Sequence, residues 1–177
     1  MPVKRTSLLA VILFLTACDS RPSLDTVDTV DLQRFMGDWY VIASIPTVFE
    51  REAYNPIENY ALNADGSIAT TFTFNAGSTE GESKIFRATG FVQNTQTNAQ
   101  WGMQFVWPIK ADYRIVYLDK DYQYTIIARQ KRDYVWIMAR SPLITAERLD
   151  QLRALVAAMG YDTQLLQRAY HQVPQIK

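Results

Sequence analysis

The chain has 177 residues, enough for one domain with a substantial buried core, and 48% of them are hydrophobic. Its 18 basic and 18 acidic side chains balance, so we expect no basic face for nucleic acid. Seven Gly and seven Pro exclude the collagenous and low-complexity classes of protein.

The first 17 residues predict an export signal. Lys4 and Arg5 give it a positive start, and residues 8–15 form an apolar run too short to span a bilayer permanently. Residues 15–18 (Leu-Thr-Ala-Cys) resemble the bacterial lipobox, in which the cysteine is lipidated and the chain is cleaved before it. An ordinary secretory peptide is the alternative, but Cys18 is the only cysteine and lies where lipidation needs it.

Lipidation of Cys18 predicts a protein held on a membrane surface at the periplasmic face, because several acyl chains exceed what stable anchoring requires. Residues 18–29 are short, polar and contain proline, so we expect them to form a tether to a domain spanning 30–177. Asp19 resembles the residue that retains lipoproteins in the inner membrane of enteric bacteria. It therefore argues for the inner membrane.

The first predicted strand follows Gly37, which lets the backbone bend sharply into it. Alternation places Trp39, Val41, Ala43 and Ile45 on one face. The segment 46–56 after this strand is bounded by prolines, and we expect a long loop that covers an opening.

Seven more short strands follow, with tight or charged turns between most of them, including Asp65-Gly66 and 119–121. Their expected ranges are 58–62, 68–74, 84–92, 100–107, 113–118, 122–130 and 134–140. Neighbours in sequence are then antiparallel neighbours in space. We therefore predict an all-β fold, an eight-stranded antiparallel up-and-down barrel that closes to avoid edges.

One helix interrupts the strands. Thr145 is a credible N-cap, apolar residues recur at helical spacing from Leu149 to Met159, and Gly160 ends the pattern. We expect this C-terminal helix to pack outside the barrel, and a last short strand over 165–171 to pair beside the first.

Three motifs in order resemble the lipocalin family: Gly-Asp-Trp at 37–39, Leu-Asp-Lys-Asp-Tyr at 118–122, and Arg140 after the last barrel strand. The resemblance implies that Gly37, Trp39 and Arg140 have a structural role at the closed end, where the guanidinium lies across the indole. The chain is most similar to the bacterial outer-membrane branch with its apolipoprotein D-like relatives. That similarity rests on 35–40, 49–51 and 132–142, covers about 30–171, and favours the outer membrane.

The resemblance also implies an inward face that encloses a ligand. The family's alternation assigns to this face, as ligand-binding residues, Glu58, Tyr60, Thr70, Phe72, Met103, Phe105, Ile115, Tyr117, Tyr124, Tyr134, Trp136 and Met138, together with Leu62, Phe74 and Ile126. Phe49 and Tyr54 are expected to form a lid, with Glu58 inside near the mouth. Such a calyx suits a fatty acid or a lysophospholipid. A barrel filled by its own side chains stays open as an alternative.

The sequence offers little for catalysis. His171 is the only histidine, so a Ser-His-Asp site centred on it is disfavoured, and no His/Cys cluster suggests a metal. Asp119 and Asp121 fit a solvated turn better than calcium. We therefore expect a noncatalytic binding protein without cofactor or metal, with the membrane and a lipid as partners and no nucleic acid. A homodimer is left open, as is the less favoured enzyme, since some relatives of the family are catalytic.

Overall fold

The computed structural model describes residues 22–172. The predicted signal segment 1–17 and the predicted lipidation site Cys18 lie outside the described residues. Two helices, a 3₁₀ helix and nine strands make up the described part. In chain order they are α1 (Leu32–Phe35), β1 (Gly37–Ile45), β2 (Ala53–Leu62), β3 (Ile68–Ala76), β4 (Ser83–Val92), β5 (Gln100–Val106), β6 (Ile109–Leu118), β7 (Tyr124–Ala128), β8 (Val135–Ala139), α2 (Ala146–Ala158), η1 (Thr163–Leu165) and β9 (Gln167–Arg168).

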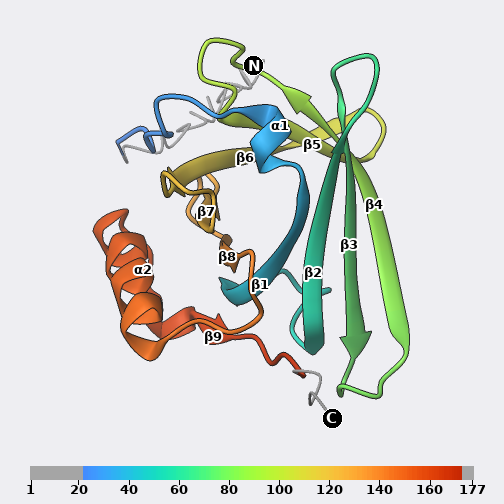
Figure 1. Ribbon diagram of the computed structural model, residues 1–177, viewed down its shortest axis with the longest axis vertical. Coiled ribbons are helices and arrows are strands. Elements are labelled where there is room, and N and C mark those ends of the chain that lie inside the picture. Colours follow the sequence, from blue (N-terminus) through green and yellow to red (C-terminus); the bar gives the residue numbers. More distant parts are fainter. Residues whose placement is uncertain (1–21, 173–177) are drawn as a thin grey trace, which may run out of the picture.

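The strands β1 to β8 form one closed antiparallel barrel (Figure 1). Each strand pairs with its neighbours in sequence, and β1 closes the ring by pairing with both β2 and β8. The predicted eight-stranded meander is confirmed. The additional strand β9 pairs with β1 as expected, although it spans only Gln167–Arg168 rather than 165–171.

A β-bulge divides β1 into two halves, and the alternation of inward and outward side chains is reversed between them. Trp39 and Val41 point into the barrel, as alternation predicts. The register with β8 shifts between Val41 and Ala43, so Ala43 and Ile45 point outward instead. The prediction that all four share a face is wrong beyond Val41, because the extra residue of a bulge reverses the alternation.

Helix α2 lies outside the barrel, as predicted (Figure 1). The Thr145 side chain accepts a hydrogen bond from the Arg148 backbone N–H, and Gly160 follows the last turn with a φ of +85°. Leu149, Leu152 and Val156 are buried in a second core shared with the outer faces of β1, β7 and β8. These strands are therefore apolar on both faces.

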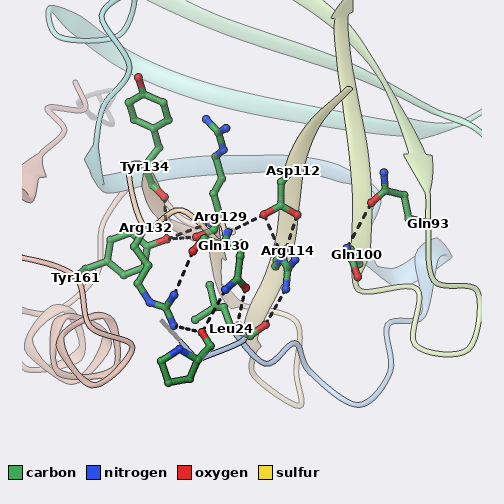
Figure 2. A network of polar contacts seen from close by, with 11 residues as sticks. Leu24, Gln93, Gln100, Asp112, Arg114, Arg129, Gln130, Arg132, Tyr134 and Tyr161 are labelled. Atoms are coloured by element: carbon green, nitrogen blue, oxygen red, sulfur yellow. Dashed lines mark hydrogen bonds and ion pairs between the residues drawn. The ribbon is translucent and has the colours of Figure 1, made fainter. Parts of the chain in front are cut away.

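The segment before α1 is attached to the barrel wall (Figure 2). The Leu24 backbone N–H donates to Gln130 Oε1 (2.8 Å), and Arg114 Nη1 donates to the Leu24 carbonyl (3.1 Å). The Leu24 side chain is buried, and the Val27 backbone N–H donates to the Ile115 carbonyl (3.0 Å). Within the segment predicted as a tether, Leu24 and Val27 therefore pack on the barrel, because their backbone groups find partners there.

Candidate functional site

An aromatic plug closes one end of the barrel. Phe35 at the end of α1 packs against Trp39, Tyr60 and Trp101, with ring centroids 5.0–5.6 Å apart. All four side chains are at most 1% exposed. Trp39 Nε1 donates to the Phe35 carbonyl (2.9 Å), which satisfies the one polar atom of the buried indole.

Arg140 covers this plug from outside. Its guanidinium carbon lies 3.9 Å from the Trp39 ring centroid. Nη1 donates to the Asp38 carbonyl (2.7 Å), and Nη2 lies 2.8–3.0 Å from the carbonyls of Arg34, Phe35 and Met36. The guanidinium therefore donates to the free carbonyls at the end of the short α1 helix and also stacks on the indole face. Gly37, with a φ of +93°, turns the chain between these contacts.

Above the plug lies a cavity of about 580 Å³. Its lining residues are Thr47, Val48, Phe49, Glu50, Glu58, Thr70, Phe72, Phe86, Arg87, Ala88, Met103, Phe105, Val106, Ala111, Asp112, Tyr113, Arg129, Tyr134 and Trp136. The plug residues Trp39, Tyr60 and Trp101 do not line it, so they lie beneath its floor. The volume falls within the range of about 300–1,000 Å³ usual for small-molecule sites.

The loop 46–52 lies over the mouth and is held there by Glu50. Glu50 Oε2 accepts hydrogen bonds from the Thr47 backbone N–H (3.0 Å) and from Trp136 Nε1 (3.2 Å). Burial raises the pKa of the Glu50 carboxyl, although these hydrogen bonds oppose the shift. One side chain thus ties the loop to itself and to β8.

Glu50→Ala is expected to loosen this loop. Loss of a charge-assisted hydrogen bond, worth about 1–2 kcal/mol, should speed amide exchange at Thr47 about 5- to 30-fold. Hydrogen exchange followed by NMR measures this. Glu52→Ala, an exposed carboxyl in the same loop, is the matched control and should leave the Thr47 amide unchanged. Equal exchange in both variants would show that Glu50 does not hold the loop.

Basic and apolar side chains surround the mouth. Figure 2 shows the Arg129 and Tyr134 side chains directed away from the network that fixes the β7–β8 loop. Arg129 Nε is buried without a hydrogen-bond partner among the described residues. Arg87 on β4 also touches the cavity, but it lies between the inward residues Phe86 and Ala88, so its side chain points to the outer face. Several large apolar side chains are exposed around this end, among them Phe49 (72%), Phe105 (60%), Val106 (68%), Trp107 (82%) and Ile109 (70%).

The floor of the cavity carries hydrogen-bonding groups. The Tyr60 hydroxyl donates to Glu58 Oε2 and is itself in contact with the Tyr113 hydroxyl. Burial raises the pKa of the Glu58 carboxyl to about 7, with a smaller contribution from the charge of Glu50. Burial also raises the pKa of both tyrosines well above the usual value. Glu58 therefore holds a proton in much of the neutral range.

The structure places the predicted ligand-binding residues in three groups. Lining the cavity are Glu58, Thr70, Phe72, Met103, Phe105, Tyr134 and Trp136, and so is the predicted lid residue Phe49. Pointing inward but packed in the core below the cavity are Tyr60, Ile115 and Met138. Phe74 points inward nearer the mouth, where its ring stacks on that of Phe86 (centroids 5.9 Å apart). Lying on the outer face, beneath α2, are Tyr117, Tyr124 and Ile126. Binding itself stays a prediction for all of them.

Three of these assignments, those of the outward residues, are wrong because of a bulge and a helix. The register of β6 with β7 shifts between Ile115 and Tyr117, so Tyr117 turns outward and its hydroxyl accepts from Arg148 Nη2 (3.1 Å). The Tyr124 ring lies under the same guanidinium, 4.3 Å from its carbon to the centroid. On β7 the inward residue is Ile127 rather than Ile126. Because α2 covers these strands, both of their faces are apolar and alternation cannot distinguish them.

Two further positions differ from expectation. Tyr54 is not a lid residue; its ring packs against Tyr170 (centroids 5.9 Å apart), because β2 already begins at Ala53. Glu58 does not lie near the mouth. It pairs with Trp39 across β1 and β2, which places it on the level of the closed end.

Several residues that line the cavity were not predicted from the sequence. Tyr113 lies two positions before Ile115, so alternation extended by one step identifies it. Phe86 and Ala88 share an inward face of β4 that the family's assignment left unused. Glu50 and Arg129 come from loops, where no periodicity predicts the direction of a side chain.

His171, the only histidine, lies outside the barrel. Its Nε2 is 2.8 Å from the Val41 carbonyl, its ring meets the Tyr40 ring edge to face, and burial lowers its pKa. The described residues contain no group of three or more His, Cys, Asp or Glu placed to hold a metal ion. Among the described helices, none combines the length and apolar character needed to cross a membrane.

Comparisons with known proteins agree with this geometry. A family described as "Lipocalin-like domain" matches residues 30–171. Temperature-induced lipocalin-1 of Arabidopsis thaliana is 27% identical over 164 residues, covering 88% of this chain and 84% of that protein. Outer membrane lipoprotein Blc of Escherichia coli K12 is 27% identical over 159 residues, covering 86% of this chain and 88% of that protein. Insecticyanin from the tobacco hornworm Manduca sexta superposes with a TM-score of 0.66 at 15% identity, covering 87% of this chain and 86% of that one.

Proposed function

The chain belongs to the lipocalin family, and from that premise we propose that it binds a single-chain lipid, a fatty acid or a lysophospholipid, inside its barrel. The observation that carries the proposal is the 580 Å³ cavity beneath the loop 46–52. A barrel filled by its own side chains would leave no such space. Relatives of this family bind small hydrophobic ligands, and the aromatic and Met side chains of this lining suit an acyl chain.

The charges at the mouth favour an anionic headgroup there. Arg129 lines the cavity from the β7–β8 loop, and its side chain is directed away from the network that fixes that loop (Figure 2). Arg129 Nη1 is 3.3 Å from Asp133, but this ion pair is partly exposed and leaves other guanidinium donors available. A carboxylate or phosphate at the mouth would accept hydrogen bonds from the outer guanidinium nitrogens of Arg129.

We further propose that lipidated Cys18 anchors the protein in the outer membrane at its periplasmic face. The relative from Escherichia coli is named an outer membrane lipoprotein, whereas Asp19 argues for the inner membrane. The Pro22 carbonyl accepts hydrogen bonds from Gln130 Nε2 (3.2 Å) and Arg132 Nη2 (3.0 Å), which lie in the same β7–β8 loop as Arg129. An anchor four residues earlier would keep the cavity mouth, with its exposed apolar side chains, close to the lipid. Sucrose-gradient fractionation of native membranes tests the location, and recovery in inner-membrane fractions would overturn it.

Ala88→Phe is expected to shorten the preferred acyl chain. Ala88 lines the cavity on β4 opposite Thr70, so a phenyl ring there occupies ligand space near the floor. Each buried methylene contributes about 0.8 kcal/mol, so displacing two or three of them lowers the affinity for the longest chains about 10- to 60-fold. Binding of a series of fatty acids, measured by displacement of a fluorescent acyl probe, gives the profile.

Thr89→Phe is the matched control, because the next residue of a strand points to the opposite face. It should leave the chain-length profile unchanged. If Ala88→Phe lowered the thermal midpoint strongly while the wild type bound no acyl chain, the barrel would be a packed core and the proposed function would fail.

A further inference from the structure

The ring of strands is closed near the plug but not at the mouth, where β4 and β5 separate. β4 pairs with β3 over residues 83–90, but it pairs with β5 only between Thr89 and Val92. In Figure 1 β4 lies beside β3 down to the β3–β4 loop. Residues 83–88 of β4 therefore have an unpaired edge on the side of β5, although β5 continues to Val106. A gap in the wall results, bordered by this edge and by the β5–β6 hairpin.

The cavity extends into this gap. Successive residues of a strand point to opposite faces of a sheet, yet Phe86, Arg87 and Ala88 all line the cavity. An outward side chain such as Arg87 touches an interior cavity where the wall ends beside it. Phe105 and Val106 line the cavity from the other side of the gap. The cavity therefore opens sideways through the wall.

A second gap in the wall is covered by the chain itself. β1 and β2 also separate toward the mouth, since they pair only over residues 37–40 and 57–60. There the segment 167–172 bridges them: the Ala169 backbone N–H donates to β1 (2.9 Å), and the Tyr170 carbonyl accepts from β2 (2.8 Å). Among the described strands, none covers the edge of β4 in this way. The gap between β4 and β5 is therefore open to another molecule.

Exposed apolar side chains gather around this gap. In the part of the chain that the structure describes, eleven large hydrophobic side chains are exposed, and eight of them belong to the loop 46–52, the first half of β4 and the β5–β6 hairpin. Three of the eight, which we call the rim residues, do not line the cavity: Ile85, Trp107 and Ile109. They do not enclose a ligand, and a cluster of this kind marks an interaction surface.

The start of the described chain lies near this surface. The Pro22 carbonyl accepts from Gln130 Nε2 (3.2 Å), and the Gln130 backbone N–H donates to Asp112 on β6 (2.7 Å; Figure 2). Asp112 is three positions from Ile109, about 10 Å along a strand. The proposed lipid on Cys18 is at most about 14 Å from Pro22, the length of four extended residues. A membrane that holds this lipid is therefore within reach of the β5–β6 hairpin.

A phospholipid surface also suits the chemistry of the gap. The Trp107 side chain has an apolar ring and one N–H donor, a combination that is favoured where headgroups meet acyl chains. Each side of the gap carries an outward basic residue next to an exposed apolar one, Arg87 on β4 and Lys110 on β6. Such cations can pair with phosphate groups while the apolar side chains lie deeper.

We infer that the rim of the β4–β5 gap docks on a phospholipid membrane, and that the acyl ligand passes between this membrane and the cavity sideways through the gap. This inference rests on the proposed function, because it specifies the partner and the route by which that ligand reaches its cavity. The rim residues then lie in the membrane interface, and the acyl chain does not have to cross water.

Trp107 reports docking directly. The protein with its natural amino terminus is combined with vesicles of phosphatidylethanolamine and phosphatidylglycerol, part of whose acyl chains are brominated to quench nearby indoles. Trp39 and Trp101 are fully buried, and subtracting the signal of Trp107→Phe removes their contribution and that of Trp136. Trp107 should lose most of its emission in brominated vesicles. The loss should persist at about 0.5 M salt, because screening weakens ion pairs but not apolar insertion.

Trp107→Glu tests the route. A charge at the rim should slow the transfer of a fluorescent fatty acid from vesicles to the protein about 10-fold, since the carboxylate has to leave water on docking. The equilibrium affinity for the same fatty acid in solution should not change, because Trp107 does not line the cavity. Leu143→Glu is the matched control: Leu143 is also exposed, but it lies three positions after Arg140 at the closed end, so its variant should transfer at the wild-type rate.

The outcomes separate this inference from the proposed function. If the vesicles leave Trp107 unquenched while the fatty acid still binds, the docking is wrong and the proposed function stands. If sedimentation shows dimers in which Trp107 is shielded, a second copy covers the rim and the inference is overturned. If Trp107→Glu transfers the fatty acid as fast as Leu143→Glu, the ligand does not pass through the gap. If the wild type binds no fatty acid, the proposed function fails and the route fails with it.

Discussion

Trp39→Ala is expected to lower the free energy of unfolding by about 3–5 kcal/mol. The indole is fully buried, contacts Phe35 beneath it and is covered by the Arg140 guanidinium 3.9 Å away. Its loss leaves a cavity at the point where α1 and the first strand meet, and it removes one of the two donors to the Phe35 carbonyl, leaving only Arg140 Nη2. Urea unfolding followed by circular dichroism measures the change.

A double-mutant cycle with Arg140→Met separates the two contributions. The cation–π contact alone should appear as a coupling energy of about 1–2 kcal/mol between the two positions. Arg140→Met should itself be costly, because the carbonyls of Arg34, Met36 and Asp38 lose their donor. Additive effects of the two substitutions would mean that the stacking of Arg140 on Trp39 contributes nothing to stability. If Trp39→Ala were as stable as the wild type, the aromatic plug would not stabilise the closed end.

The architecture of the barrel could be predicted because its signals are local. Short turns such as Asp65-Gly66 join strands that pair with their sequence neighbours, so strand order follows from chain order. The closed end was also predictable, since Gly37, Trp39 and Arg140 occur in a recognisable order and the structure brings them together. The helix followed from its caps and its apolar spacing.

The facing of several residues could not be predicted, because two physical effects leave no mark in the sequence. Bulges after Val41 and Ile115 reverse the alternation, so Ala43 and Tyr117 face outward. Helix α2 buries the outer faces of β7 and β8, so the inward residue Ile127 and the outward residue Ile126 look alike in the sequence.

The depth of a residue along the barrel axis could not be predicted from the sequence either. Glu58 faces inward as expected, but strand register sets its level, and it pairs with Trp39. Register depends on where β2 begins, and the strand starts at Ala53, inside the segment expected to be loop. Glu58 was therefore expected near the mouth, whereas the structure has it at the floor.

Glu58 also predicts how stability depends on pH. Its pKa is about 7 in the folded protein against an ordinary value of 4.5, chiefly because burial disfavours its charge. Below pH 4.5 the carboxyl is protonated in both folded and unfolded states and costs nothing. Between pH 4.5 and 7 only the folded state keeps the proton, so stability falls as pH rises, and above pH 7 the loss is complete. At about 1.4 kcal/mol for each pH unit of the shift, the total is about 3 kcal/mol.

Glu58→Gln should remove this loss, because the amide resembles the protonated carboxyl in shape and cannot ionise. The difference in unfolding free energy, variant minus wild type, is expected to rise by about 3 kcal/mol between pH 4.5 and pH 8. Urea unfolding across this range measures it, and taking the difference cancels the titration of all other groups that the substitution leaves unperturbed. Glu52→Gln, at an exposed position of the mouth loop, is the control and should follow the wild-type curve. If the Glu58→Gln curve also ran parallel to the wild type, Glu58 would be ionised throughout this range, and the floor of the cavity would have to hold a charge that none of the groups facing it balances.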